Sequence, residues 1–184
     1  MDKIIIGLVG EIASGKDTLV EHLKNKHQIT THKFSASLRD ILDRLYLDIN
    51  RENMQKLSQV LRENFSQNLL SEVIAGDVKK DDNKIIIVNG IRRLTDIEYL
   101  EELPEFVLIY ITADLEKRHS RIAERGENED DKNKTLEQFK IDNEAEPEQQ
   151  ISKVAETADH KIDNNGSFDE LHQQMDDILN KLQK

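Results

Sequence analysis

The chain has 184 residues, a length typical of one domain. Its composition is 36% hydrophobic, 34% charged and only 4% aromatic, which indicates a soluble protein with few rings for stacking single-stranded nucleic acid. The formal net charge of −11 repels polyphosphate backbones, so no nucleic-acid partner is expected and a phosphate ligand must be held by a local cluster of donors.

The sequence contains no cysteine, which excludes disulfides, thiolate metal sites and cysteine nucleophiles. The first residues show neither a basic leader nor a cleavage site, and together these features predict a cytoplasmic protein. No apolar run approaches the roughly 18 residues that a membrane-spanning helix needs. No membrane segment is therefore predicted.

Apolar runs rich in β-branched residues alternate with amphipathic stretches along the chain. The predicted strands are 4–9, 32–34, 84–89, 106–111 and 160–163. The predicted helices are 15–26, 37–47, 51–64, 67–78, 96–102, 115–125 and 168–182. This alternation predicts an α/β fold with a parallel sheet and right-handed crossovers. In the last helix, the apolar spacing predicts packing on the chain's own sheet.

Two segments interrupt the alternation. The range 37–80 reads as wholly helical, and we expect it to form an insert over the carboxyl edge of the sheet, where α/β folds bind ligands. The range 125–134 is polar and free of apolar residues, which predicts either the tip of a lid or a solvated loop. We expect one domain over 1–184, with an acceptor-binding insert at 37–80 and a lid region at 115–146.

A glycine-rich turn follows the first predicted strand. The sequence Gly-Glu-Ile-Ala-Ser-Gly-Lys at 10–16 has the pattern glycine, four residues, glycine, lysine, and it stands between a strand and a helix. Its glycines let the turn close around an anion, and its N–H groups and the helix N-terminus face the phosphates. The predicted nucleotide-binding residues of this turn are Gly10, Ala13, Ser14, Gly15, Lys16, Asp17 and Thr18.

Asp17 stands where this motif commonly offers a hydroxyl to Mg²⁺. Its carboxylate either holds Mg²⁺, directly or through water, or serves only as an acid that favours the helix dipole. Asn89 ends the 84–89 strand, where P-loop proteins usually carry an aspartate, so the metal would depend on Asp17 and on the nucleotide. Arg92 follows at the same edge and is suited to fork onto an acceptor phosphate, unless it is a surface arginine.

Three arginines lie three and four residues apart on the 115–125 helix: Arg118, Arg121 and Arg125. Phosphoryl transfer needs alignment and neutralised charge more than covalent help, so these arginines and Lys16 are the predicted catalytic residues. The alternative is an exposed basic helix that pairs with nearby acids.

Together these motifs resemble the small P-loop kinases, which include nucleoside and deoxynucleoside monophosphate kinases and dephospho-CoA kinases. The sequences at 15–18 (Gly-Lys-Asp-Thr) and 34–39 (Phe-Ser-Ala-Ser-Leu-Arg) look like the deoxynucleoside monophosphate kinases. The stretch 158–166 is similar to the last strand and loop of dephospho-CoA kinases. The resemblance implies a three-layer α/β/α P-loop NTPase fold with a five-stranded parallel sheet, ATP as donor and Mg²⁺ as cofactor.

The resemblance also implies site residues outside the phosphate loop. Asn165 and Gly166 would lie beside the adenine of ATP, and Ser35, Arg39 and Arg92 would bind the acceptor. In two places the sequence departs from the family: the segment 142–146 is acidic where many relatives carry another arginine, and the Asp-Ala-Asp element of dephospho-CoA kinases is missing. The second departure favours a nucleotide acceptor, because a phosphate acceptor needs little proton abstraction.

Three functions stay open. The first is ATP-dependent phosphoryl transfer to a nucleoside or deoxynucleoside monophosphate, and the second is transfer to dephospho-CoA or another small metabolite. The third is a nucleotide-binding switch without transfer, which Asn89 favours and the lid arginines oppose. The sequence leaves open the base preference, ATP against GTP as donor, and a monomer against a homodimer.

Overall fold

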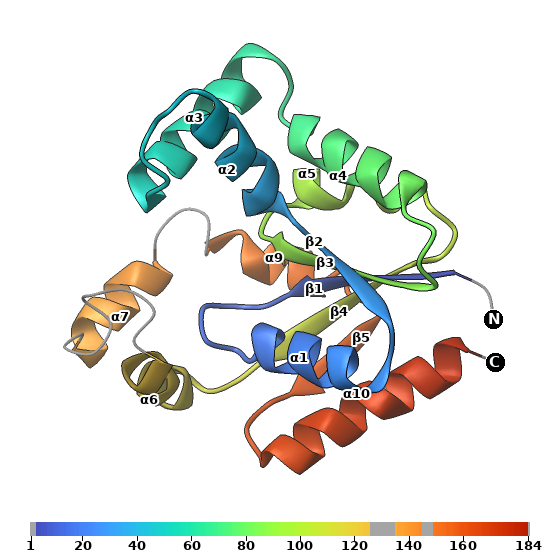
Figure 1. Cartoon of the computed structure of the whole chain (residues 1–184). Helices are drawn as coiled ribbons and strands as arrows, with labels where there is room; N and C mark the ends of the chain where they lie inside the picture. Colours follow the sequence, from blue (N-terminus) through green and yellow to red (C-terminus); the bar gives the residue numbers. More distant parts are fainter. Residues whose placement is uncertain (1–2, 126–134, 145–148, 184) are drawn as a thin grey trace.

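A parallel β-sheet organises the computed structural model, which describes residues 3–125, 135–144 and 149–183 (Figure 1). Its strands are β1 (Ile4–Val9), β2 (Ile29–Lys33), β3 (Ile85–Ile91), β4 (Phe106–Thr112) and β5 (His160–Asp163). Their order is β2-β3-β1-β4-β5, and all neighbours pair in parallel. The predicted five-stranded parallel sheet is confirmed, with β1 at its centre.

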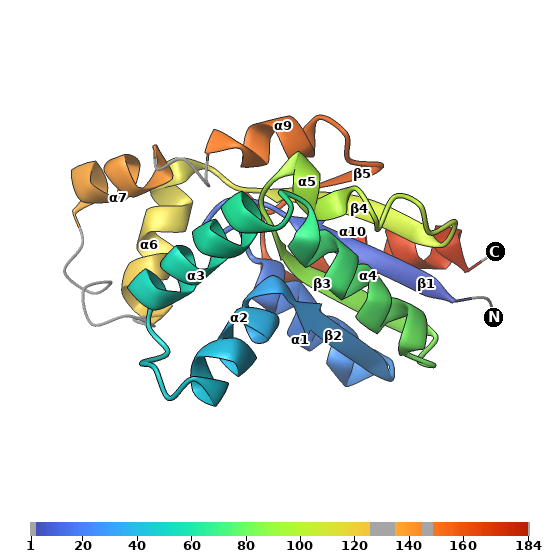
Figure 2. The same cartoon turned by 90° about the horizontal axis from the view of Figure 1, so that it is seen from above.

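Helices cover both faces of this sheet (Figures 1 and 2). In the described residues they are α1 (Lys16–Lys26), α2 (Phe34–Arg44), α3 (Arg51–Asn64), α4 (Leu69–Lys80), α5 (Leu94–Ile97), α6 (Leu115–Arg125), α7 (Leu136–Asn143), α9 (Ile151–Ala155) and α10 (Phe168–Leu182). None of the described helices combines the length and apolar character that crossing a membrane requires.

The strands are apolar throughout because both of their faces are buried. On β1, Ile4, Ile6 and Leu8 belong to the core beneath α1 and α10. Ile5 and Val9 point the other way, into the core beneath α2, α4 and α9. Side chains alternate between faces along a strand, so one continuous apolar run supplies both cores. The predicted three-layer α/β/α arrangement is confirmed.

The accuracy of the predicted helix bounds differs from helix to helix. The bounds of α3, α6 and α10 agree with the prediction, whereas α2 begins at Phe34 and ends at Arg44. Buried residues of α10 include Leu171, Met175 and Leu179, as its apolar spacing predicts. Phe168 is the exception, because its side chain is 66% exposed at the start of the helix.

The expected insert over 37–80 is not one unit. Leu70, Ile74 and Val78 of α4 are buried in the core on one face of the sheet, so α4 belongs to the covering layer. Only α2 and α3 extend toward the carboxyl edge, where α6 and α7 lie opposite them (Figures 1 and 2). The prediction that the whole range covers the carboxyl edge is therefore wrong for α4, whose four-residue apolar spacing creates a face that must be buried.

Two short helices, α7 and α9, were not predicted. Phe139 of α7 is fully buried and lies beneath the guanidinium of Arg118, 5.6 Å from the ring centre. A single buried ring gives little periodic signal, which explains why pattern reading misses this helix. The predicted polar loop at 125–134 lies outside the described residues, except for its first residue, and so does part of the acidic segment 142–146.

Candidate active site

The turn between β1 and α1 packs closely against neighbouring residues, and a side chain in place of either of its two glycines would clash with them. Gly15 has φ 106°, in the left-handed region that favours glycine, and a Cβ there would lie 2.2 Å from Nδ2 of Asn164. A Cβ on Gly10 would lie 2.3 Å from the carbonyl oxygen of Ile111. The turn therefore fits against β4 and the end of β5 only without side chains at these positions.

Lys16 lies across this turn. Its ammonium donates to the carbonyl oxygens of Gly10 and Glu11, at 2.6 and 2.9 Å, and more weakly to Oγ of the buried Ser14 at 3.4 Å. Ala13, in the same turn, has a positive φ of 61°, which is uncommon for a residue with a Cβ. The chain thus bends sharply around the point where Lys16 places its charge.

Glu11 ties the same turn to β4. The hydroxyl of Tyr110 donates to Oε1 of Glu11 at 2.7 Å. Burial raises the pKa of Tyr110, and the Glu11 carboxylate adds to the rise. Because Tyr110 stays protonated at neutral pH, its hydroxyl remains a donor and anchors the turn.

Asp17 and Asn89 meet at the first turn of α1. Nδ2 of Asn89, a 6% exposed residue of β3, lies 3.2 Å from Oδ1 of Asp17. Among the described residues, no group of three His, Cys, Asp or Glu side chains surrounds a metal position. The donor set of one carboxylate beside the hydroxyl-bearing Thr18 fits a Mg²⁺ ion that arrives with the nucleotide's own oxygens, since magnesium keeps few protein ligands.

The arginines of α6 point to different places. Nη2 of Arg121 donates to the carbonyl oxygen of Asn164 at 2.8 Å. Its Nη1 is buried and has no hydrogen-bond partner within the described part of the chain. A buried guanidinium nitrogen without an acceptor carries a desolvation cost, which an anionic oxygen in the cavity would relieve.

Arg118 is turned away from the cavity. It is 7% exposed, and its guanidinium donates to the carbonyl oxygens of Ala113 and Ile12, at 3.0 and 3.1 Å, and to Oδ1 of Asn143 at 2.6 Å. These contacts join α6 to the phosphate loop and to α7. The expected convergence with Arg121 is absent in the described conformation because buried carbonyls bind Arg118, and the side chain of Arg125 lies outside the described residues.

A cavity of about 590 Å³ lies over the carboxyl edge of the sheet. The predicted residues that line it are Gly10, Ala13, Ser14, Gly15, Lys16, Asp17, Thr18, Ser35, Arg92 and Arg121. It runs from the phosphate loop to the ends of β2 and β3, because parallel strands all end at this edge. The fold thus brings together five sequence segments that lie far apart along the chain, because α6 and the segment after β5 also contribute lining residues.

At one end of the cavity, the structure differs from the prediction. Asn165 and Gly166 line a separate surface hollow, and Oδ1 of Asn165 accepts from the backbone N–H of Asp114 at 2.8 Å. Asn164 and Phe168 line the main cavity in their place. The loop after β5 turns Asn165 toward the start of α6, and this turn could not be read from the sequence.

Asn164 was not among the predicted site residues, although the sequence carries a signal for it. It follows the last residue of β5 directly, and it is only 3% exposed. Its Nδ2 donates to the carbonyl oxygen of Ser14 at 2.8 Å. A polar residue just beyond a buried strand, at the edge where the other strands end, is itself a signal of a site.

At the other end, the acceptor-side predictions divide. Ser35 and Arg92 line the cavity, together with Lys33, which was not predicted. Arg39 lies one turn beyond Ser35 on α2, is exposed and does not line the cavity. Lys33 is the last residue of β2, so its position at the carboxyl edge follows from the strand's true end, one residue earlier than predicted.

A parallel sheet in this strand order, with a glycine-rich phosphate loop after its central strand, defines a kinase-like P-loop fold. A family model described as an AAA domain matches residues 6–165, and the chain belongs to this family (AAA_18). The predicted membership of the P-loop kinase-like class is confirmed.

Similar proteins agree with this assignment. The UPF0200 protein of Hyperthermus butylicus is 26% identical over 180 residues, which cover 98% of this chain and 95% of the relative. The crystal structure of TT1252 from Thermus thermophilus matches with a TM-score of 0.64 at 18% identity, over 99% of both chains. A shikimate kinase from Bacteroides thetaiotaomicron matches with a TM-score of 0.60 at 11% identity, over 96% of this chain and 98% of the other. At these identities, the two structures show a shared fold.

Proposed function

We propose that the protein transfers the terminal phosphoryl group of ATP to a small phosphorylated acceptor, a nucleoside or deoxynucleoside monophosphate. The observation that carries this proposal is the continuity of the cavity. The phosphate loop lines one part of it, and Lys33, Ser35 and Arg92 line another. A protein that only held a nucleotide would need the first part alone.

The donor binds with its phosphates in the turn between Gly10 and Thr18. Backbone N–H groups and the N-terminus of α1 face the anion, and Lys16 exchanges carbonyl contacts for phosphate oxygens. Asp17, with Asn89 beside it, holds Mg²⁺ directly or through water. When bound, this ion neutralises charge on the donor phosphates.

The acceptor lies at the ends of β2 and β3. Lys33 and Arg92 supply positive charge, and Ser35 supplies a hydroxyl. Arg39 lies four residues after Ser35 on the same face of α2 and adds a further positive charge. An oxygen of the acceptor phosphate attacks the terminal phosphorus of ATP, a new P–O bond forms, and the bond to the bridging oxygen of ADP breaks. Because the attacking oxygen of the acceptor phosphate is already ionised at neutral pH, no general base is required.

Arg121 is the arginine best placed to act on the transferred group. Its side chain lines the cavity, and its guanidinium charge stabilises the charge that spreads over the equatorial oxygens during transfer. Arg118 supports the phosphate loop from behind through Ile12. Arg125, at the end of α6, remains the third arginine of the proposal.

The test is a turnover panel with the purified protein and Mg-ATP. Acceptors are the ribo- and deoxyribonucleoside monophosphates, dephospho-CoA and shikimate, and ADP is measured with and without each. We expect ADP and a nucleoside diphosphate only with particular monophosphates. Turnover with dephospho-CoA or shikimate instead would replace the acceptor, and nucleotide binding without any turnover would replace the kinase by a switch.

Lys16→Met should lower kcat/KM at least about a hundredfold, because a charge that acts on the developing transition state is lost. The matched control is Lys24→Met on the same helix, where the ammonium is about half exposed and pairs only with Glu21 in the described structure. This control should keep wild-type turnover. Circular dichroism checks that both variants are folded, and a Lys16 variant with unchanged turnover would contradict the proposal.

A further inference from the structure

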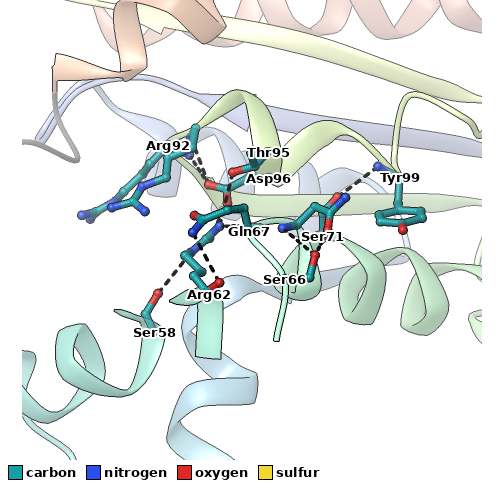
Figure 3. Close-up of polar contacts among 11 residues, drawn as sticks. Ser58, Arg62, Ser66, Gln67, Ser71, Arg92, Thr95, Asp96 and Tyr99 are labelled. Atoms are coloured by element: carbon teal, nitrogen blue, oxygen red, sulfur yellow. Dashed lines mark hydrogen bonds and ion pairs between the residues drawn. The ribbon is translucent and has the colours of Figure 1, made fainter. Parts of the chain in front are cut away.

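A buried ion pair joins α3 to the turn that follows β3. Nη2 of Arg62 lies 2.6 Å from Oδ1 of Asp96, and the two residues are 7% and 3% exposed. Arg62 belongs to the last turn of α3, and Asp96 to α5, 34 positions along the chain. Figure 3 shows the carboxylate between the Arg62 side chain and the backbone at Arg92.

The second oxygen of this carboxylate holds the turn itself. Oδ2 of Asp96 accepts from the backbone N–H groups of Arg92 and Arg93, at 2.9 and 3.0 Å. Gly90, near the end of β3, has φ 92°, and both Gly90 and Arg92 line the cavity. One carboxylate therefore binds a helix with one oxygen and a cavity-lining turn with the other.

Arg62 is fixed from its own side as well. Its Nη1 donates to the carbonyl oxygen of Gln67 and to Oγ1 of Thr95, the latter at 3.3 Å, and its Nε donates weakly to Oγ of Ser58 at 3.4 Å (Figure 3). Every nitrogen of the guanidinium thus has an acceptor, and these acceptors come from α3, from the link to α4 and from α5. The planar fork of arginine suits such a junction, whereas lysine offers a single point of charge.

A contribution to the stability of the fold does not by itself explain the buried pair of Arg62 and Asp96. Apolar residues of similar volume often replace buried ion pairs without loss, because desolvation offsets much of the attraction. What an apolar pair cannot do is accept two backbone N–H groups and orient them. The arrangement therefore points to placement of the turn as the role of the pair.

We propose that Arg62 and Asp96 are positioning residues that set the Arg92 turn against α3 and thereby place Arg92 for the acceptor phosphate. The acceptor part rests on the proposed function, whereas the link between α3 and the turn does not. A displacement of about 1 Å in a positioning group can cost a hundredfold in rate. A small shift of the turn that carries Arg92 would therefore impair both acceptor binding and transfer.

The first test measures hydrogen exchange in the ligand-free full chain. Arg62→Met removes the guanidinium, which touches neither backbone N–H group of the turn. We nevertheless expect the amides of Arg92 and Arg93 to exchange at least tenfold faster, with β1 and β4 unchanged. An exposed arginine on α2 gives the control, Arg44→Met, in which these two amides should keep their wild-type rates.

Two exchange results would overturn the link. Unchanged rates at Arg92 and Arg93 in Arg62→Met would show that Asp96 holds the turn without α3. Equal acceleration throughout the sheet would show that the pair only adds global stability, because loss of global stability raises exchange in every cooperative unit.

The second test uses the monophosphate that the wild type phosphorylates. Arg62→Met and Asp96→Asn should each raise the acceptor KM about tenfold and leave the KM for ATP within twofold. The double variant Arg62→Met/Asp96→Asn removes both buried charges, so its melting temperature should recover while the acceptor KM stays raised. Recovery of both together would overturn positioning. If no acceptor is found, the proposed function fails, and the exchange experiment still decides the link.

Discussion

Asn164 connects three parts of the candidate site with one residue. Its side-chain nitrogen binds the carbonyl oxygen of Ser14, its own carbonyl oxygen accepts from Arg121, and its amide group closes on Gly15. The phosphate loop and α6 are therefore held to the same point at the end of β5. A change at Asn164 would alter the phosphate loop and the position of α6 together.

Phe168 lies beside this junction, with an exposed ring on the cavity. Its ring stacks on His172, with centroids 6.4 Å apart, and is well placed to receive a nucleotide base. We predict that Phe168→Ala weakens ATP binding about tenfold, since stacking contributes roughly 1–3 kcal/mol per base. Inorganic tripolyphosphate has no base and should bind both proteins equally, as measured by calorimetry.

A matched control is Phe65→Ala, because Phe65 is 73% exposed and does not line the cavity. It should leave ATP affinity unchanged. If Phe168→Ala weakened tripolyphosphate as much as ATP, the ring would support the phosphate loop and not a base.

Hydrogen bonds of Asp81 connect the turn between α4 and β3 to strand β2. Asp81 accepts from the backbone and side chain of Asn83, at 2.9 and 2.8 Å, and lies 2.9 Å from Nε2 of His32 on β2. Burial alone would raise the pKa of Asp81, but the hydrogen bonds from Asn83 and His32 outweigh it and lower the pKa from 3.8 to about 2. The folded state therefore favours the ionised carboxylate.

This lowered pKa predicts how stability depends on pH. The contribution of Asp81 is complete above its unfolded pKa, about 4, and is lost as the pH falls from there towards 2. Urea midpoints of the wild type and Asp81→Asn should differ most near pH 5, and the difference should shrink as the pH falls to about 2.5. A difference that stays constant over this range would mean that the charge of Asp81 makes no contribution.

The two hydrophobic cores share the strands of one sheet, so the described chain should unfold as one unit. Leu23 lies in the core beneath α1 and α10, and Ile74 in the core beneath α4, with the sheet between them. Leu23→Ala and Ile74→Ala should each lower the free energy of unfolding by roughly 2–5 kcal/mol. Their effects should add in the double variant, because the sites make no shared contact.

Urea unfolding, monitored by far-ultraviolet circular dichroism, measures the free energy of unfolding of each variant. We expect one transition in every variant, with a lower midpoint and an unchanged slope. Two separate transitions, or a variant that loses only part of the signal, would show that the range 1–184 is not a single cooperative domain.

Local patterns sufficed for much of the architecture. Continuous β-branched runs identified the central strands, the glycine spacing at 10–16 identified the phosphate loop, and long amphipathic periods identified α3, α6 and α10. Each of these signals lies within one segment, where backbone conformation and burial follow from nearby residues. All seven predicted residues of the phosphate loop accordingly line the cavity.

Only the tertiary structure decided which side chains of distant segments face one another. Arg118 and Arg121 have the same spacing signal, yet Arg118 binds the carbonyl oxygens of Ala113 and Ile12, whereas Arg121 lines the cavity. Asn164 replaces Asn165 because of the turn after β5, and α4 joins the covering layer because its apolar face finds the sheet. The sequence determined the central strands, most of the long helices and the phosphate loop, since these depend on local periodicity. The direction of each polar side chain depends on acceptors that only folding brings within reach.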